Sequence, residues 1–137
     1  MIEGLSHITL IVRDLDNMGQ ILEQVLGAKE VYRSGEKQFS LSPERFYLVG
    51  EIWVAVMVGE ALAERTYNHI AFKVPDDALD GYLARIEALG LDVKPSRSRV
   101  EGEGRSIYFY DHDNHLFELH SGTLDERLAR YAREVAA

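Results

Sequence analysis

The sequence predicts an α+β fold made of two β-α-β-β-β modules followed by a C-terminal helix. Three observations predict it: one motif occurs twice, each copy precedes a stretch with helical periodicity, and short strand-like runs follow each helix. The chain has 137 residues, a length typical of one domain. We therefore expect a single domain over residues 1–137, with one module at about 1–60, a second at about 65–122 and the last helix at about 123–136.

The repeated motif is H-I-x-[LF]-x-V-x-D. It reads His-Ile-Thr-Leu-Ile-Val-Arg-Asp at residues 7–14 and His-Ile-Ala-Phe-Lys-Val-Pro-Asp at residues 69–76. The alternation of apolar and polar residues in both copies predicts a half-buried strand. Each module is therefore expected to open with a strand that begins at a histidine.

A predicted helix follows each copy of the motif. Apolar residues fall on one helical face between residues 15 and 26, and again between residues 79 and 89. Short polar residues precede these stretches and glycines follow them, as expected for helix caps. The expected caps are Asp14 and either Asp76 or Asp77 at the N-termini, and Gly27 and Gly90 at the C-termini.

Strand-like runs complete each module, and a helix ends the chain. A capping box, Thr123 with Glu126, predicts the start of that helix, and Leu124, Leu128 and Tyr131 fall on one stripe of it with Val135. The predicted strands are 28–32, 46–49 and 52–58 in the first module, and 91–94, 106–110 and 116–120 in the second.

Composition excludes several classes of protein. The net charge of −8 disfavours binding to nucleic acid, because phosphate backbones repel an acidic chain. No apolar run approaches the ~20 residues that a membrane span needs, and no signal peptide opens the sequence. The absence of cysteine removes disulfides and thiolate chemistry, and it suits a cytoplasmic protein.

The repeat points to a candidate metal site. His7 and His69 hold the same position in two related strands, and Glu118 lies on the corresponding face of the last strand. Two imidazoles and one carboxylate would hold a divalent cation and leave positions open for water or substrate. Alignment of the modules places Ala55 opposite Glu118, so a fourth protein ligand is missing. The alternative is that both histidines are ordinary core residues and Glu118 a surface carboxylate.

Three further histidines are weaker candidates. His112 and His115 fall in a polar turn, where a solvated role is expected. His120 shares a face with Glu118 and is expected to support the ligands rather than to bind the metal.

At these residues the sequence resembles the vicinal oxygen chelate superfamily, which includes glyoxalase I and extradiol dioxygenases. Within it the chain is most similar to the fosfomycin resistance proteins of the FosX-type epoxide hydrolases. The similarity extends over essentially the whole chain, and its most specific block is Val-Glu-Gly-Glu-Gly-Arg-Ser-Ile-Tyr-Phe-Tyr at residues 100–110. Other matching stretches are 1–12, 67–72, 117–120, 122–124 and 126–128.

The resemblance implies a site and an assembly. His7, His69 and Glu118 match the Mn²⁺ ligands of the family, and Glu44 matches the general base of its hydrolase branch. The family is a homodimer with exchanged modules, so one subunit is expected to supply His7 and its partner the other two ligands. Positions that line the substrate pocket correspond to Thr9, Trp53, Tyr67, Ser106, Tyr108 and Arg127.

The chemistry of fosfomycin, a small phosphonate with an epoxide ring, agrees with these residue types. A divalent cation can polarise the epoxide oxygen, and Arg127 offers a planar fork for phosphonate oxygens. Water is a poor nucleophile, so Glu44 would remove its proton during attack. Each residue has an alternative role. Glu44 could be a solvated carboxylate in a turn at a helix start, and Arg127 could belong to a solvent-exposed helix face. Tyr108 could be an aromatic residue that only packs.

The loop between Lys94 and Arg105 also carries Arg97 and Arg99 among glycines. This composition suits a mobile lid that gathers anions, although two glutamates in the loop offset part of its charge. The stretch 95–99 departs from the family pattern, which leaves phosphonate contacts from Arg97 or Ser98 open.

We therefore expect Mn²⁺-dependent hydration of the fosfomycin epoxide, although zinc would also suit the ligands. One alternative is a thiol-S-transferase that uses glutathione or bacillithiol, which would not need Glu44 as a base. Another is a drug-binding protein without catalysis, which would not need an open metal site. A glyoxalase- or dioxygenase-like enzyme is disfavoured by Ala55 and by the 100–110 block.

Overall fold

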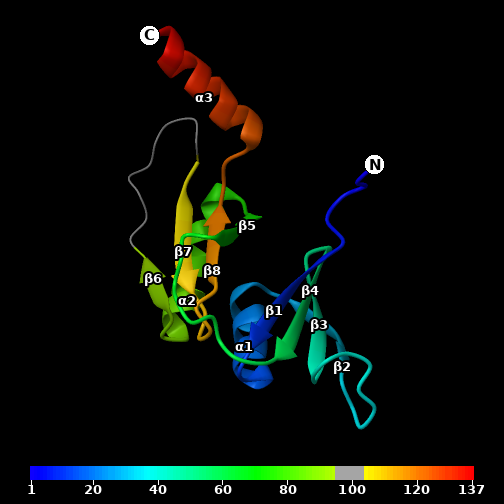
Figure 1. The fold of residues 1–137 in the computed structure, drawn as a ribbon. Helices are drawn as coiled ribbons and strands as arrows, with labels where there is room; N and C mark the ends of the chain where they lie inside the picture. The colour runs from blue at the N-terminus through cyan, green and yellow to red at the C-terminus, as the bar shows by residue number, and fades with distance from the viewer. Residues whose placement is uncertain (95–103) are drawn as a thin grey trace. The chain divides into compact units, whose positions relative to one another are not determined.

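The computed structural model describes residues 1–94 and 104–137, which form two four-stranded sheets with helices (Figure 1). The first sheet has the order β1-β4-β3-β2 and the second β5-β8-β7-β6. The chain divides into two compact units: the first contains residues 1–65 and 111–114, and the second contains 66–110 and 115–137. The predicted α+β class and the repeated strand order are thus confirmed.

The first unit contains β1 (His7–Val12), β2 (Lys29–Arg33), β3 (Glu44–Val49) and β4 (Ile52–Val58). β1 runs parallel to β4, and β3 is antiparallel to both β4 and β2. The third of these strands begins two residues earlier than the pattern predicts, and this extension places Glu44 inside the sheet.

One helical stretch covers this sheet but has two geometries. α1 (Leu15–Gln20) begins at Asp14, whose carboxylate accepts a hydrogen bond from the backbone N–H of Asn17 at 3.0 Å, as predicted. A π-helical segment, Ile21–Val25, continues it and ends before Gly27, where φ is +65°. The predicted caps are confirmed, and the change to wider helical turns was not predicted.

The second unit repeats this arrangement with β5 (His69–Lys73), β6 (Asp92–Lys94), β7 (Ser106–Tyr110) and β8 (Leu116–His120). β5 is parallel to β8, and β7 is antiparallel to its two neighbours. α2 (Leu79–Ala88) lies after a short 3₁₀ turn and ends before Gly90, where φ is +66°.

The expected acidic N-cap of the second helix is wrong. The 3₁₀ turn Asp76–Ala78 starts after Pro75, and no side chain caps it. Asp76 instead accepts a hydrogen bond from the Ser121 hydroxyl at 2.9 Å. The 3₁₀ turn places the Asp76 carboxylate beside Ser121 at the end of β8, so it bonds this residue and not the helix.

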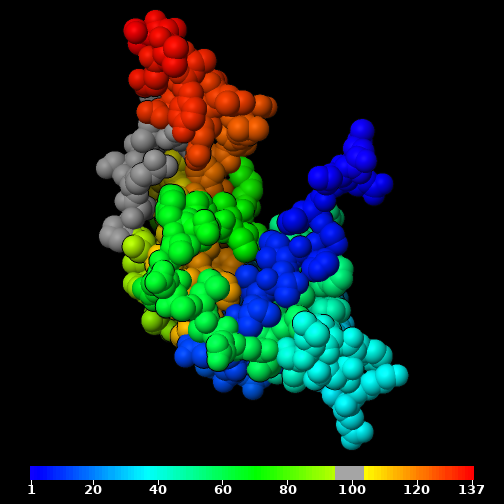
Figure 2. Space-filling view, in the orientation of Figure 1, coloured from blue at the N-terminus to red at the C-terminus, as the bar shows by residue number. Residues whose placement is uncertain are grey.

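α3 (Leu124–Ala136) begins with the predicted box, in which Thr123 Oγ1 accepts from the N–H of Glu126 at 3.2 Å. Within the described chain no α3 residue is buried, and its apolar stripe, including Leu124 and Leu128, is exposed. Figure 2 shows the atoms of this helix in orange to red. None of the helices that the structure describes is long and apolar enough to cross a bilayer.

Candidate functional site

In the first unit, the register of three strands places four predicted site residues on one face of the sheet. His7 pairs with Trp53, and Thr9 pairs with Ala55. Glu44 pairs with Met57, which lies two residues beyond Ala55 on β4. Since side chains two residues apart on a strand share a face, His7, Thr9, Trp53 and Glu44 point to the same side.

Glu44 is buried, with 7% of its surface exposed, and it begins β3 rather than a helix. Its backbone is fixed by exchange of hydrogen bonds with Ser34, whose hydroxyl accepts from the Glu44 N–H at 2.9 Å. Among the described residues no side chain donates a hydrogen bond to its carboxylate. The interpretation of Glu44 as a solvated turn residue is therefore wrong: Glu44 is a buried strand residue.

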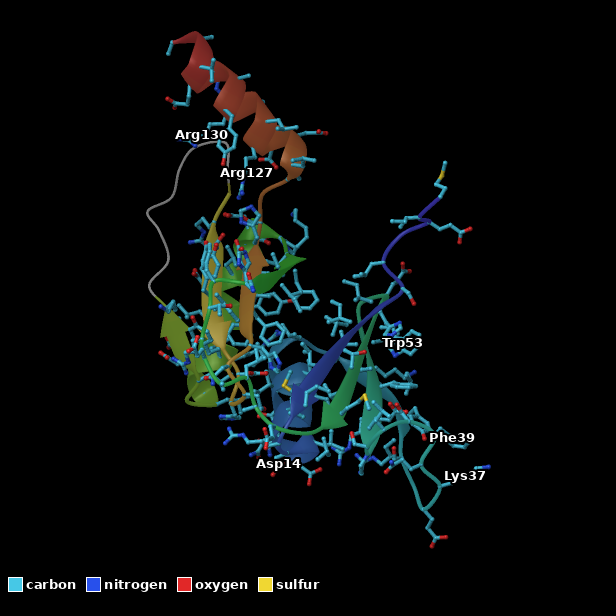
Figure 3. All side chains as sticks on the ribbon, viewed as in Figure 1. Asp14, Lys37, Phe39, Trp53, Arg127 and Arg130 are labelled. Atoms are coloured by element: carbon cyan, nitrogen blue, oxygen red, sulfur yellow. The ribbon has the colours of Figure 1, made fainter. Side chains whose placement is uncertain are left out.

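His7 lies against Trp53 in the same unit. Their rings are 4.2 Å apart between centroids, and the Phe46 ring meets the indole in a T-shaped arrangement with 5.2 Å between centroids. The imidazole Nδ1 is 2.9 Å from the hydroxyl of Ser6. The indole Nε1 of Trp53, labelled in Figure 3, is buried and has no partner among the residues that the structure describes.

In the second unit, His69 and Glu118 converge. Nε2 of His69 lies 3.0 Å from Oε1 of Glu118. Nδ1 of His69 is 2.7 Å from the carbonyl of Tyr67, which can only accept, so Nδ1 is the donor there and Nε2 is the nitrogen that faces Glu118. Neighbouring donors of a small octahedral cation with bonds of ~2.1 Å are also about 3.0 Å apart. The pair thus fits two positions of a divalent metal.

The carboxylate of Glu118 is held from its other side. Only 5% of the residue is exposed, and Oε2 accepts a hydrogen bond from the Ser106 hydroxyl at 2.5 Å. Nδ1 of His120 is 2.7 Å from the same hydroxyl and 3.3 Å from Oε2. Ser106, expected only at the substrate, therefore contacts a candidate metal ligand.

Tyr67 and Tyr108 lie beside His69. Their hydroxyls are 3.1 Å apart, and the ring of Tyr108 meets the imidazole edge-on at 5.5 Å between centroids. Tyr67 is largely exposed, whereas Tyr108 is buried. Burial, the Tyr67 hydroxyl and the negative charge of Glu118 raise the pKa of Tyr108 well above its usual value, so the phenol stays a hydrogen-bond donor.

A pocket of about 310 Å³ adjoins this group. His69, Glu118 and His120 line it on the strand side, and Arg127 lines it from α3. Arg127 extends from the helix toward the end of β8 (Figure 3), where its Nη2 is 3.4 Å from Nε2 of His120. Thr123 at the start of α3 also lines the pocket, so the guanidinium of Arg127 and the positive end of the helix dipole favour an anion there.

The end of the predicted lid is fixed by an ion pair. Arg105 Nε lies 3.4 Å from Asp76 Oδ1, and the backbone N–H of Arg105 donates to the Ser121 hydroxyl at 2.8 Å. Gly104 has φ +73°, and a Cβ there would lie 2.4 Å from the backbone nitrogen of Gly122. This close approach was not predicted, and the glycine itself was its only signal in the sequence. Arg97, Ser98 and Arg99 lie outside the described residues.

The polar turn after β7 has a structural role. Asp113 is buried, and its Oδ1 accepts from both the N–H and the Nε of Arg13 at 3.0 Å. The carbonyl of His112 accepts from Nη2 of the same arginine. The imidazole of His112 is exposed, as expected for a solvated residue.

No group of three or more metal-binding side chains occurs among the described residues. The structure brings His69 and Glu118 together, with Tyr67, Ser106, Tyr108 and Arg127 around them, in the second unit. It places His7 with Thr9, Trp53 and Glu44 in the first unit.

Comparisons with known proteins identify relatives over the full length. The family model described as the Glyoxalase/Bleomycin resistance protein/Dioxygenase superfamily matches residues 4–119. The fosfomycin resistance protein FosX of Mesorhizobium japonicum is 66% identical over 137 residues, which cover 100% of this chain and 99% of the relative. The metallothiol transferase FosB of Shouchella clausii is 35% identical, and the match covers 97% of this chain and 90% of the relative.

A similar solved structure is a FosX variant from Listeria monocytogenes, complexed with Mn(II) and 1S,2S-dihydroxypropylphosphonic acid. It is 56% identical, has a TM-score of 0.88, and the match covers 96% of this chain and 99% of that one.

Proposed function

Since the chain belongs to the Glyoxalase/Bleomycin resistance protein/Dioxygenase superfamily and, within it, to the FosX-type fosfomycin resistance proteins, we propose that it inactivates fosfomycin by Mn²⁺-dependent hydration of the epoxide ring. Two findings on relatives support this reaction. The identity to FosX is 66%, against 35% to the thiol transferase FosB. The FosX of Listeria monocytogenes was solved with Mn(II) and a dihydroxypropylphosphonic acid, which is the diol that hydration would give.

The observation that carries the proposal is the pair of His69 and Glu118. Nε2 of His69 and Oε1 of Glu118 are 3.0 Å apart. Nδ1 of His69 is held by the Tyr67 carbonyl, and Oε2 of Glu118 is held by the Ser106 hydroxyl. Both donors are thus oriented before any ligand binds. We assign Mn²⁺ to this pair together with His7, as the resemblance implies.

The cation supplies a Lewis acid that polarises the epoxide oxygen when it is bound. The chain itself provides the base. Glu44 accepts a proton from the attacking water, whose oxygen forms a bond to one ring carbon while the bond from that carbon to the epoxide oxygen breaks. That oxygen takes a proton from solvent to give the diol, and Glu44 releases its proton to solvent. Among the described residues no side chain donates to the Glu44 carboxylate, so its oxygens are left to accept a hydrogen bond from water. A thiolate nucleophile would not require such a base.

The phosphonate is assigned to the pocket beside α3. Arg127 and the first turn of the helix provide positive charge and N–H donors. Tyr108 stays protonated and can donate a hydrogen bond to a phosphonate or epoxide oxygen. The remaining proposed contacts are Thr9, Trp53, Tyr67 and Ser106.

The proposal includes a homodimer with exchanged modules and a cytoplasmic location. In this dimer, His7 of one subunit completes the site that His69 and Glu118 of its partner begin. This arrangement rests on the resemblance to the family; His7 belongs to the first unit of the chain, and His69 and Glu118 belong to the second. The cytoplasmic location rests on the cysteine-free composition.

Phosphorus NMR of fosfomycin tests the function. Chelator-treated protein in thiol-free buffer is expected to form the diol only after Mn²⁺ is added, and Glu118→Ala is expected to form none. Turnover that requires a thiol would support a transferase instead, and binding without turnover under both conditions would support a drug-binding protein.

A further inference from the structure

The two oxygens of the Glu118 carboxylate have different surroundings. Oε1 faces Nε2 of His69, whereas Oε2 faces the Ser106 hydroxyl and Nδ1 of His120. Beyond His120, at its Nε2, lies Nη2 of Arg127. Four side chains from β7, β8 and α3 therefore form one hydrogen-bond network, which runs from Arg127 through His120 and Ser106 to the candidate metal ligand Glu118.

The donors and acceptors fix the direction of each hydrogen bond in this network. Arginine has only donors and a carboxylate only acceptors, so both ends are defined. Arg127 can only donate to Nε2 of His120, so Nδ1 is the ring nitrogen that donates in turn. Nδ1–H donates to Ser106 Oγ at 2.7 Å, and the single hydroxyl proton of Ser106 is left for Oε2 of Glu118 at 2.5 Å. The N–H of Arg127, the Nδ1–H of His120 and the O–H of Ser106 thus each have one acceptor in the network.

We propose that Ser106 and His120 are positioning residues that orient Glu118 for Mn²⁺ and link it to Arg127. They hold Oε2, so that Oε1 stays beside Nε2 of His69. The same contacts join the carboxylate that would bind the cation to the guanidinium that would bind the phosphonate. This inference rests on the proposed function, since it concerns how the two halves of that site are held.

The first sheet provides an internal comparison. The row formed by Lys73, His120 and Ser106 in the second sheet corresponds to Ile11, Met57 and Glu44 in the first. Ala55 stands where the second sheet has Glu118, so the first sheet has no carboxylate to orient at that position. The serine and histidine thus occur only in the sheet that has the candidate ligand, which the repeated fold by itself does not require.

The physical effect concerns affinity for the metal. A carboxylate that rotates freely must be ordered when it binds a cation, and outer partners of metal ligands typically contribute about 10–100-fold in metal affinity. Loss of the Ser106 hydroxyl or of Nδ1–H of His120 would release Oε2. Loss of Nε2 alone would leave Glu118 held and would affect only Arg127.

Matched variants separate these contributions. His120→Leu removes both ring nitrogens, whereas His120→Asn keeps an N–H donor near the position of Nδ1 and removes the acceptor for Arg127. Ser106→Ala removes the hydroxyl, and Ser106→Thr keeps it. His112→Leu makes the same substitution at an exposed imidazole outside the site. Thermal unfolding of each variant verifies that it folds.

The measurement is the dissociation constant for Mn²⁺, obtained from the EPR signal of the free ion during titration. His120→Leu and Ser106→Ala are expected to raise it about 10–100-fold. His120→Asn, Ser106→Thr and His112→Leu are expected to stay close to wild type. The KM for fosfomycin is expected to rise in His120→Asn while kcat changes little, since only the contact with Arg127 is lost.

The outcomes distinguish this inference from the proposed function. Wild-type Mn²⁺ affinity in folded His120→Leu would overturn the positioning role, even if the protein hydrates fosfomycin. Weakened Mn²⁺ binding in the variants of a protein that does not hydrate fosfomycin would support the positioning role and overturn the function. A wild-type protein that does not bind Mn²⁺ would overturn both.

Discussion

Glu44 and Ser106 occupy equivalent positions in the two sheets. Glu44 pairs with Met57 on β4 and Ser106 pairs with His120 on β8, in each case two residues beyond the position held by Ala55 or Glu118. The same place in the fold thus carries a buried carboxylate without a donor in one unit and a hydroxyl bonded to Glu118 in the other. The repeat supplied two equivalent positions, and the two modules use them for different chemistry.

Removal of the charge at Glu44 is expected to stop hydration without preventing binding. Glu44→Gln keeps the shape of the side chain but cannot take a proton from water, so kcat in thiol-free buffer is expected to fall by about 10²–10⁴-fold. Phosphorus NMR measures the rate, and calorimetry with Mn²⁺-loaded protein measures fosfomycin binding. Glu51→Gln, at an exposed turn, is the control. Unchanged kcat in Glu44→Gln would contradict the assignment of the base.

Module exchange predicts that two inactive variants restore activity when they share a dimer. His7→Ala and Glu118→Ala each inactivate their own homodimers. In the mixed dimer with exchanged modules, intact His7 of one chain meets intact Glu118 of the other at one of the two sites. Random mixing is then expected to restore about a quarter of wild-type activity.

Co-refolding of the two purified variants tests this expectation. An equal mixture of wild type with Glu118→Ala controls for the refolding yield, because half of its sites stay active at any degree of subunit exchange. Activity that stays at the level of the separate variants, with mixed dimers demonstrated by mass spectrometry, would mean that each site is built within one chain.

The environment of Tyr108 predicts an effect at alkaline pH. Its pKa is raised in the folded protein, so the unfolded chain loses this proton near pH 10 while the folded protein keeps it. The contribution of Tyr108 to stability is therefore complete below pH 10 and is lost as the pH rises above it. We expect the free energy of unfolding in urea to fall more steeply above pH 10 for wild type than for Tyr108→Phe. Parallel pH profiles would contradict this environment.

The ion pair of Arg13 and Asp113 is expected to stabilise the fold. The buried carboxylate accepts two hydrogen bonds from Arg13, one of them from the backbone. Asp113→Ala leaves that N–H without its partner and is expected to cost about 1–3 kcal/mol in the free energy of unfolding. Urea titration measures it, with Glu60→Ala at an exposed position as the control. Equal midpoints for Asp113→Ala and wild type would show that the contact contributes little.

Much of the fold and part of the site could be predicted because they depend on local pattern. The two motif copies fixed the equivalence of His7 and His69, and the strand register confirms that of Ala55 and Glu118. Asp14 caps its helix as predicted, because that hydrogen bond involves neighbours in the sequence.

Contacts between distant residues could not be predicted in this way. Asp76 bonds Ser121 rather than a helix terminus, and Asp113 pairs with Arg13 from the far end of the chain. Glu44 is buried because the pairing of β3 with β4 extends two residues beyond the predicted strand, to the pair of Glu44 and Met57. The sequence did not indicate this extension, because Pro43 directly before Glu44 suggested a turn. Such partners lie far apart in the sequence and meet only once each unit has folded.

The central claim is that water, deprotonated by Glu44, opens the epoxide directly. A single turnover in H₂¹⁸O, with Mn²⁺-loaded protein in excess over fosfomycin, tests it by mass spectrometry of the product. We predict a diol that carries one ¹⁸O from the first turnover onward, because the new oxygen comes from solvent. A first-turnover diol without ¹⁸O would show that a carboxylate of the protein attacks the ring and is hydrolysed afterwards, and that result would contradict the role assigned to Glu44.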